Sequence, residues 1–519
     1  MSALGTWLIQ GDTRIGRIYD GNMACRRREW RGVVSTWVDF LGWLKLWGIL
    51  IGFTMKAPVK IFRSFFEYRW MPSYLAAPAF VDKQSRGQRA PLLKVTREEF
   101  AAIIKMGTVY IADMLKADRK LGGSKKLSKK IVLFDEMTMI QIMGGFPNLI
   151  GIPYQLMPVF LVSEIDQLSC IPYIDAIESF GLPSETCPLP TSEAGAAVID
   201  AYPHCGACFI SSSMPCDGSD MASSYQARRF KLPTYHLTFP VRYDDEDTLE
   251  AAAEDIKGCI KFIEDNTGEK FDWDAYFTVI RRFNEETKLE MERWEINRTP
   301  YPQITGASLH LWRAYMYQIE GGLHPWLEKV YRDCNKIMLK NYEQKKRPSS
   351  SSRYRAMVWN VPSHYFPDFS RWAENCWGIN VLADMVILNF TKMLNTEDQE
   401  EAIRDLGRLY ERMVMRKHTN GGYGHVLDEL WRMAEAYKVD MVFMYQHVAC
   451  KTMAGLQGLF DDQARERGIP LIWIEHDIMD PRTVSRREMR KSVNNFMLNV
   501  FHAEPADPSL VDFDDDNTW

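Results

Sequence analysis

The sequence predicts an α/β protein with two similar domains, each built on a small parallel sheet flanked by helices. In one unit that occurs twice, an apolar strand-like run ends at a cysteine, a helix-like run follows, and a second apolar run begins at or after a proline. The unit places Cys216 seventeen positions before Pro233, and Cys450 twenty positions before Pro470. The last third of the chain also alternates between short β-like and longer helical runs, which is typical of parallel strands with right-handed crossovers.

Composition limits the class of protein. The chain has 519 residues, of which 46% are hydrophobic and 25% charged, as expected for a globular protein with two or three cores. A net charge of -5 argues against a nucleic-acid-binding role, which normally needs a basic excess. We expect the ten cysteines to be reduced in a cytoplasm, because Met1–Asp20 lacks the pattern of a secretory signal.

Residues 1–128 form a Trp-rich extension that we expect to be mostly helical. Its apolar stretch Val33–Met55 is interrupted by Asp39 and Lys45, so the uncharged run that remains is too short to span a bilayer. We expect a helix that is buried or contacts another subunit; a membrane-surface helix is the alternative, and a true span is the least favoured. The basic stretch Gly122–Lys130 is predicted to be a solvated linker.

A first α/β domain is predicted over residues 129–245, and it contains Cys187 and Cys216. A helical segment over 246–347 follows, because its apolar residues recur with a period near 3.6. The run KKRPSSSSR (Lys345–Arg353) then predicts a flexible surface loop.

A second α/β domain is predicted over residues 348–505, and it contains Cys450. Runs rich in β-branched and aromatic residues predict its four strands: Arg355–Val361, Ile379–Val386, Val439–Tyr445 and Pro470–Glu475. The intervening patterns predict helices over Glu397–Lys417 and His425–Lys438. Residues 506–519 form an acidic tail, whose last part, Asp512–Trp519, we expect to be disordered.

Three cysteines are candidates for a metal site: Cys187 in LPSETCPLP, Cys216 in MPCDG and Cys450 in VACKT. Each lies in or near a turn after an apolar run, where loops of parallel sheets hold ligand-binding groups. Thiolates are soft, charged donors that bind iron and zinc. Spacings of 29 and 234 residues match no compact zinc ribbon, so from the residues alone a shared metal centre and ordinary packed cysteines both remain open.

A competing motif is PHCGAC, with His204, Cys205 and Cys208. It could be half of a zinc site or a redox motif, but it lacks a second ligand pair, and Cys208 opens an apparent buried strand. We therefore expect a structural role. The remaining cysteines fall on helical or core-like patterns and are expected to be packing residues: Cys25, Cys170, Cys259, Cys334 and Cys376.

Several chemistries have no motif in this chain. There is no GxSxG elbow, no HExxH and no DxDxDG loop. The phosphate-binding GxxxxGK[ST] is also absent, so a reaction that needs ATP would require a second protein to hydrolyse it.

Over Lys129 to Pro505 the chain resembles the 2-hydroxyacyl-CoA dehydratase and benzoyl-CoA reductase family, specifically iron-sulfur subunits of the 2-hydroxyglutaryl-CoA dehydratase D-component type. The resemblance is carried, in order, by ESFGLPSETC, MPCDG with KLPTYHLTFP, TGEKFDWDAYFTVIRRFNE, RYRAMVWNVP and RGIPLIWIEHDIMDPRTVSRREMRKSVNNF. The specific landmarks are DWD at Asp272–Asp274, preceded by Thr267 and Gly268, and DxxDPRxxS at Asp477–Ser485.

The resemblance implies a [4Fe-4S] cluster held by Cys187, Cys216 and Cys450, with one iron left open for water, substrate or another small ligand. It also implies three partners: a sister iron-sulfur subunit in a heterodimer or larger assembly, a separate homodimeric iron-sulfur ATPase that injects the electron, and an acyl-CoA substrate.

The resemblance first implies a 2-hydroxyacyl-CoA dehydratase, in which one-electron reduction gives a ketyl radical, the 2-hydroxyl leaves by syn-type loss of water, and an enoyl-CoA results. One alternative is a subunit of an ATP-dependent aromatic (benzoyl-CoA) reductase, in which two electrons stay in the ring as a cyclic diene. The other is a non-catalytic electron-relay subunit of such a complex.

Two further residues are candidates for proton chemistry. Tyr154, in IPYQLM, stands where many substrate-bearing members have an acidic residue, but its far higher pKa means that the role does not carry across directly, and packing is the alternative. His447, three residues before Cys450, could donate a hydrogen bond to a cluster sulfide or a proton to substrate, or be a structural histidine.

Overall fold

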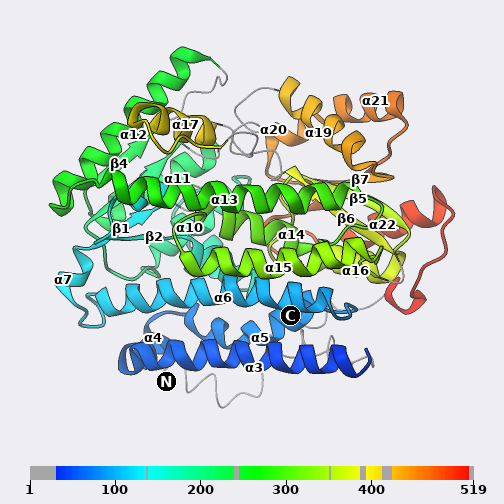
Figure 1. The fold of residues 1–519 in the computed structure, drawn as a ribbon, viewed down its shortest axis with the longest axis horizontal. Helices are drawn as coiled ribbons and strands as arrows, with labels where there is room; N and C mark the ends of the chain where they lie inside the picture. Colours follow the sequence, from blue (N-terminus) through cyan, green and yellow to red (C-terminus); the bar gives the residue numbers. More distant parts are fainter. Residues whose placement is uncertain are drawn as a thin grey trace.

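The fold was obtained as a computed structural model, which describes residues 31–135, 138, 140–213, 216–238, 245–349, 352–385, 393–411 and 423–512. Two four-stranded parallel sheets lie side by side, with helices packed around them and a layer of N-terminal helices along one edge (Figure 1). The predicted α/β class, with two similar sheets and a helical N-terminal region, is confirmed.

The first sheet has the strand order β2-β1-β3-β4, with every neighbouring pair parallel. Its strands are short and mostly apolar: β1 (Ile131–Phe134), β2 (Ile150–Pro153), β3 (Cys208–Ser212) and β4 (Thr234–Leu237). In the central pair, Val132 lies opposite Cys208, and both are fully buried. Burial on both faces explains why β1 and β3 are continuous apolar runs rather than alternating ones.

The second sheet repeats this arrangement with the order β6-β5-β7-β8. Its strands are β5 (Tyr354–Trp359), β6 (Ile379–Asp384), β7 (Met441–His447) and β8 (Leu471–His476). The strand before Cys216, β3, and the strand before Cys450, β7, therefore hold the same place in their sheets. The strand order reverses beside them, which is where open α/β sheets bind ligands.

All four strands predicted for the second sheet are observed, with ends shifted by a few residues. The two predicted helices correspond to α17 (Gln399–Glu411) and α19 (Tyr423–Tyr437). Residues 412–422, which include the predicted end of the first helix, lie outside the described residues, as do 513–519 of the expected disordered tail.

The segment between the sheets is helical, as predicted. It contains α12 (Glu246–Thr267), α13 (Trp273–Arg298), α14 (Ala307–Leu311) and α15 (Pro325–Glu343). The DWD landmark begins α13: the Asp272 carboxylate accepts a hydrogen bond from the Ala275 N–H at 3.0 Å. Gly268 ends α12 with a φ of 77°, a conformation that favours glycine. This landmark is therefore a capped connection between two long helices.

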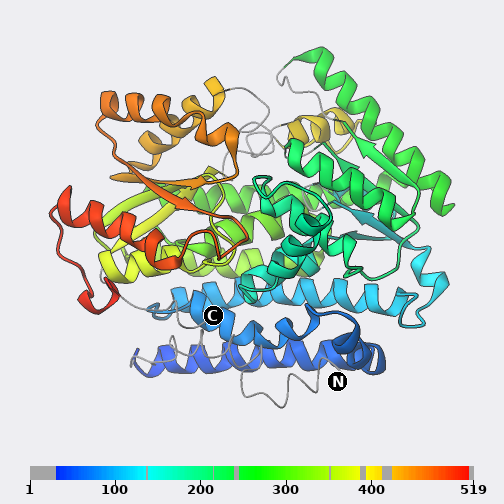
Figure 2. The same cartoon turned by 180° about the vertical axis from the view of Figure 1, so that it is seen from behind.

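The N-terminal region forms α3 (Val33–Lys56), α4 (Pro58–Glu67), α5 (Ala77–Gln84), α6 (Leu92–Ala117) and α7 (Lys125–Ser128). The central helix of this layer is α6, and most of its side chains are buried. Phe100, Ile104 and Ile111 of α6 share one continuous core with Ile131 and Leu133 of β1. Figure 2 shows α6 running beneath both sheets from the opposite side.

The stretch Val33–Met55, predicted to form a helix that is buried or contacts another subunit, is helical, but only one side of it is buried in this chain. The helix α3 is present, but its buried residues are only Ser35, Leu46, Leu50 and Phe53. Its outward side chains are apolar and exposed, for example Trp37 at 59% and Ile51 at 61%. Apolar residues on both faces gave a sequence pattern that did not distinguish the covered face from the open one.

Candidate functional site

Cys187, Cys216 and Cys450 line one cavity of about 320 Å³. The first two come from the unit of the first sheet, and the third comes from the unit of the second sheet. The other lining residues also come from both units, including Pro190, Asn360 and Ile478. All three thiols are half-buried. The fold therefore brings together three side chains that are far apart in the sequence.

Each of these cysteines lies immediately before a helix. Cys187 precedes α10 (Pro188–Val198), Cys216 precedes α11 (Asp217–Phe230), and Cys450 precedes the single turn α20 (Lys451–Ala454). The carbonyl of each cysteine accepts the first hydrogen bond of its helix, at 3.3, 3.1 and 3.0 Å respectively. Each cysteine is therefore the residue at which a loop after a strand or helix turns into the next helix.

The pKa of the Cys187 thiol shows how close the three groups are. Burial raises this pKa well above its ordinary value, and Cys216, Asp477 and Cys450 act in the same direction, while a backbone hydrogen bond with Leu189 opposes them. Thiolates at these positions would repel one another. A bound cationic group would remove that repulsion, because coordination deprotonates a thiol outright.

His447 lies against this group at the end of β7. Its Nε2 is 3.1 Å from the Cys187 sulfur. Burial lowers the pKa of His447 to about 4, so the ring is neutral at physiological pH. A neutral imidazole can donate one hydrogen bond to a sulfur, or accept one from a thiol. His476, at the end of β8, lies beside it with the ring centres 5.6 Å apart and the ring planes tilted by 41°.

The arrangement suits a cluster better than a single ion. Among the described residues, no three His, Cys, Asp or Glu side chains lie close enough to hold one metal ion. In an iron-sulfur cluster each thiolate binds a different iron, so the sulfurs stand apart around a pocket. Three thiols around one cavity are compatible with that requirement.

Tyr154 does not lie in this pocket. Its hydroxyl donates a hydrogen bond to the Pro203 carbonyl, and its ring stacks on Tyr202 with the centres 4.7 Å apart. It lines a separate cavity with His204 and Cys205. Burial raises the pKa of Tyr154 well above its ordinary value. These contacts are those of a packed aromatic residue.

The PHCGAC motif shows the features of a structural element. His204 Nε2 pairs with Asp200 at 2.6 Å, and Cys205 and Cys208 are almost completely buried. Burial raises the pKa of Cys208 to about 12, which keeps its thiol protonated. Four of the expected packing cysteines are also buried: Cys170, Cys259, Cys334 and Cys376. Cys25 lies outside the described residues.

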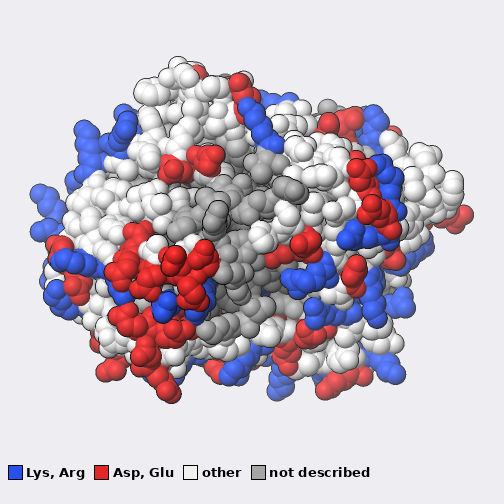
Figure 3. Space-filling model, turned by 90° about the horizontal axis from the view of Figure 1, so that it is seen from above, with Lys and Arg blue, Asp and Glu red and all other residues white. Residues whose placement is uncertain are grey.

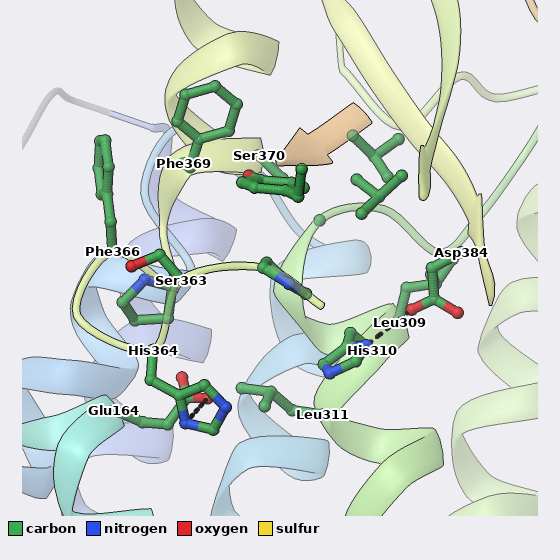
Figure 4. Close-up of a pocket in the computed structure, with 16 residues that line it drawn as sticks. Glu164, Leu309, His310, Leu311, Ser363, His364, Phe366, Phe369, Ser370 and Asp384 are labelled. Atoms are coloured by element: carbon green, nitrogen blue, oxygen red, sulfur yellow. Dashed lines mark hydrogen bonds and ion pairs between the residues drawn. The ribbon is translucent and has the colours of Figure 1, made fainter. Parts of the chain in front are cut away.

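A second polar cluster was not anticipated from the sequence. Glu164, His310, His364 and Asp384 face a small cavity of about 30 Å³, room for about one water molecule (Figure 4). Glu164 lies 3.4 Å from His364 Nδ1, and His310 Nδ1 lies 2.9 Å from Asp384. Burial raises the pKa of Glu164 well above its ordinary value and lowers that of His364 to about 3. His364 is therefore neutral near pH 7, and burial favours the neutral form of Glu164 as well.

One short segment after β5 separates this cluster from the cysteine pocket. Asn360 and Val361 line the cysteine pocket, whereas Ser363 and His364 line the polar cavity. The His364 N–H donates to the carbonyl of Ile478, which also lines the cysteine pocket, at 2.8 Å. The sequence feature that could have pointed to this cluster is His364, which lies three residues beyond the end of the predicted strand Arg355–Val361.

The DxxDPRxxS landmark joins the two units beside the pocket. The Asp477 carboxylate accepts hydrogen bonds from the Met479 and Asp480 N–H groups, each at 2.8 Å. Arg482 pairs with Asp480 and with Asp175 of the first unit, each at 2.7 Å. Burial raises the pKa of Asp477 to about 6. The landmark therefore fixes the loop that carries Ile478 into the pocket wall.

Comparison with known families agrees with this geometry. The model of the family described as 2-hydroxyglutaryl-CoA dehydratase, D-component, matches residues 158–497, about two thirds of the chain. The matched region includes all three pocket cysteines and the whole second sheet. A search of curated proteins gave no match. Because the family match extends over most of the chain, the protein belongs to the 2-hydroxyglutaryl-CoA dehydratase D-component family.

Proposed function

We propose that this chain is the iron-sulfur subunit of a radical 2-hydroxyacyl-CoA dehydratase, and that Cys187, Cys216 and Cys450 hold its [4Fe-4S] cluster. The observation that supports the proposal most directly is the single cavity lined by three thiols from two units. Family membership supports the dehydratase type of enzyme.

When bound, the cluster supplies a low-potential one-electron centre with one iron free for a small ligand. The chain's own residues have three tasks around it. The starts of α10, α11 and α20 position the three sulfurs, which coordination to the cluster would keep as thiolates. Neutral His447 donates a hydrogen bond toward the Cys187 sulfur. Val361 and Ile478 form an apolar part of the pocket wall, which limits the access of water to the pocket.

The proposal includes partners and a location. A sister iron-sulfur subunit and a homodimeric iron-sulfur ATPase would supply the electron, since the sequence has no phosphate-binding loop of its own. The substrate would be an acyl-CoA, and the assembly would work in the cytoplasm.

Anaerobic reconstitution with iron and sulfide tests the cluster. We expect about four irons per chain in the full-length protein, with an EPR signal after reduction. Serine at Cys187, Cys216 or Cys450 should each reduce the bound iron strongly. Cys205→Ala and Cys208→Ala are matched controls at buried thiols and should retain it. Equal iron in all five variants, or zinc in place of iron, would contradict the proposal.

His447→Ala provides a separate readout. We expect the variant to keep its iron but to be reduced at a lower potential, because a hydrogen bond to sulfur stabilises the reduced, more negative state. An EPR-monitored redox titration would measure this, and an unchanged potential would assign His447 a purely structural role.

The electron-relay role is a second candidate, favoured by Tyr154. At the position where many substrate-bearing relatives have an acidic residue, this chain has a tyrosine that packs away from the pocket. Assays of the assembled complex with both thioester classes separate the alternatives. An enoyl-CoA product supports the dehydratase, a cyclic diene supports an aromatic reductase, and no substrate-induced change at this cluster supports the relay.

A further inference from the structure

The outer face of α3 and α4 is an exposed apolar surface, which we call the N-terminal plateau. Of the twenty large apolar side chains exposed in the described part of the chain, eleven lie between residues 33 and 66. They are Val33, Val34, Trp37, Phe40, Leu41, Leu44, Ile51, Met55, Val59, Phe62 and Phe66. Such a concentration marks an interaction site rather than scattered surface residues.

The spacing on α3 places these side chains on one face. Residues 34, 37, 41, 44, 48, 51 and 55 recur every three or four positions, and all are exposed. The opposite face carries Leu46, Leu50 and Phe53, which are buried against the protein. On α4, Val59, Phe62 and Phe66 continue the plateau. The apolar area therefore spans two helices rather than a single helical seam.

Ion pairs hold α3 flat along the molecule. Arg97 of α6 is 3% exposed, and it pairs with Asp39 of α3 and with Asp82, the latter at 2.6 Å. Lys45 of α3 pairs with Glu98. Among the described helices, α3 alone is long and apolar enough to cross a bilayer. If α3 crossed a bilayer, these ion pairs would break and the buried Arg97 charge would lose its Asp39 partner, which is energetically costly. In Figures 1 and 2 the helix lies along the edge of the molecule, beside α6.

The charge of this region favours a negatively charged partner. Residues 31–66 contain five basic side chains and one acidic one, Asp39, whereas the whole chain carries a net charge of -5. Lys56 and Arg63 are exposed at the plateau. On the side of the molecule opposite α3, one cluster of Asp and Glu side chains lies on a face that also carries Lys and Arg (Figure 3). The residues of the plateau therefore carry a net positive charge, although the net charge of the chain is negative.

We propose that the N-terminal plateau docks this protein on an anionic phospholipid bilayer, with α3 and α4 lying in the plane of the interface. Exposed aromatic and aliphatic side chains combined with basic ones are the features of interfacial helices. A second copy fits less well, because two identical plateaus would bring like charges together. The proposal does not depend on the cluster.

Vesicle co-sedimentation of the full chain tests the proposal. We expect binding to phosphatidylcholine vesicles that contain about 30% phosphatidylglycerol, with at least about tenfold weaker partitioning to phosphatidylcholine alone or in high salt. Leu41→Glu with Phe62→Glu should reduce partitioning about tenfold or more. Phe180→Glu with Val500→Glu, at exposed apolar positions elsewhere, is the matched control and should change nothing.

Charge reversal at Lys56 and Arg63 gives an independent check, because both side chains are exposed and their replacement should leave the fold intact. We expect loss of the preference for anionic vesicles with an unchanged melting temperature. Failure of the wild-type chain to bind anionic vesicles would overturn the proposal. A dimer that Leu41→Glu dissociates, without any vesicle binding, would identify the plateau as a subunit interface and would also overturn it.

Discussion

The Glu164 and His364 pair has a consequence for stability that can be worked out from proton counts. Between pH 3 and 6.5, native His364 binds fewer protons than the unfolded chain, because its pKa is lowered from 6.5 to about 3. Above pH 4.5, native Glu164 binds more protons than the unfolded chain, because its pKa is raised from 4.5. The two effects oppose each other between pH 4.5 and 6.5, so they partly cancel there.

Single substitutions should expose the two slopes. Glu164→Gln removes the Glu164 contribution, so relative to wild type the free energy of unfolding should rise from pH 5 to 6.5. His364→Asn removes the His364 contribution, so relative to wild type the free energy of unfolding should fall by about 2 kcal/mol over the same interval. Urea unfolding at the two pH values measures both. Slopes of the same sign would show that the pair is not neutral in the native state.

Individual site residues differed in how far the sequence could identify them. The three pocket cysteines were selected because each lies in or near a turn after an apolar run and because of a family resemblance, and the structure places all three around one cavity. Glu164 and His364 are 200 positions apart, and nothing local in the sequence joins them. Tyr154 was a candidate by position alone, and only the fold reveals its contacts with Pro203 and Tyr202.

At the scale of elements, Arg293 of α13 links the long helices. It is 1% exposed and bonds to Glu99 of α6 and Asn335 of α15, each at 2.7 Å. Burial raises the pKa of Glu99 to about 7, although the Arg293 charge opposes this. The guanidinium is the main group that compensates the buried carboxyl groups around it.

Removing this cation should be strongly destabilising. We expect Arg293→Ala to lower the free energy of unfolding by about 3–5 kcal/mol, because it leaves the buried Glu99 carboxyl without its ion-pair partner, whereas Glu290 keeps Arg313. Lys261→Ala is the matched control, since Lys261 pairs with Asp265 on the surface, where both side chains are more than half exposed, and should cost about 0.5 kcal/mol or less. Equal losses in chemical denaturation would show that Arg293 is not the central link.

Helices and strands could be predicted where the spacing of apolar residues changes from that of a strand to that of a helix. The second sheet followed from β-branched runs separated by amphipathic helices, and strands such as β7 and β8 begin within two residues of the prediction. The helix α3 was located correctly, but the sequence did not distinguish its covered face from its open face, because both faces are apolar. Which face is covered depends on α6 and on Arg97, and no local pattern encodes that contact.

At the scale of the whole molecule, the N-terminal helices belong to the main core. Phe100 and Ile111 of α6 share that core with β1, although the family match begins only at residue 158. We expect a chain lacking residues 1–117 to fail to unfold cooperatively, because one wall of the first sheet would be exposed. A chain lacking only residues 1–56 should retain a cooperative thermal transition at a lower temperature. A full-length melting temperature for the shorter chain would contradict this expectation.

The division of the pocket between two units also fixes an order of events during synthesis. Cys450 leaves the ribosome 234 residues after Cys216, roughly 10 to 50 s later at ordinary translation rates. Under the proposed function, the nascent chain therefore contains only two of the three cluster cysteines until Cys450 has been synthesised. Complete loading of the cluster then has to follow the synthesis of Cys450. Bound iron therefore indicates that both units have been made and have packed together.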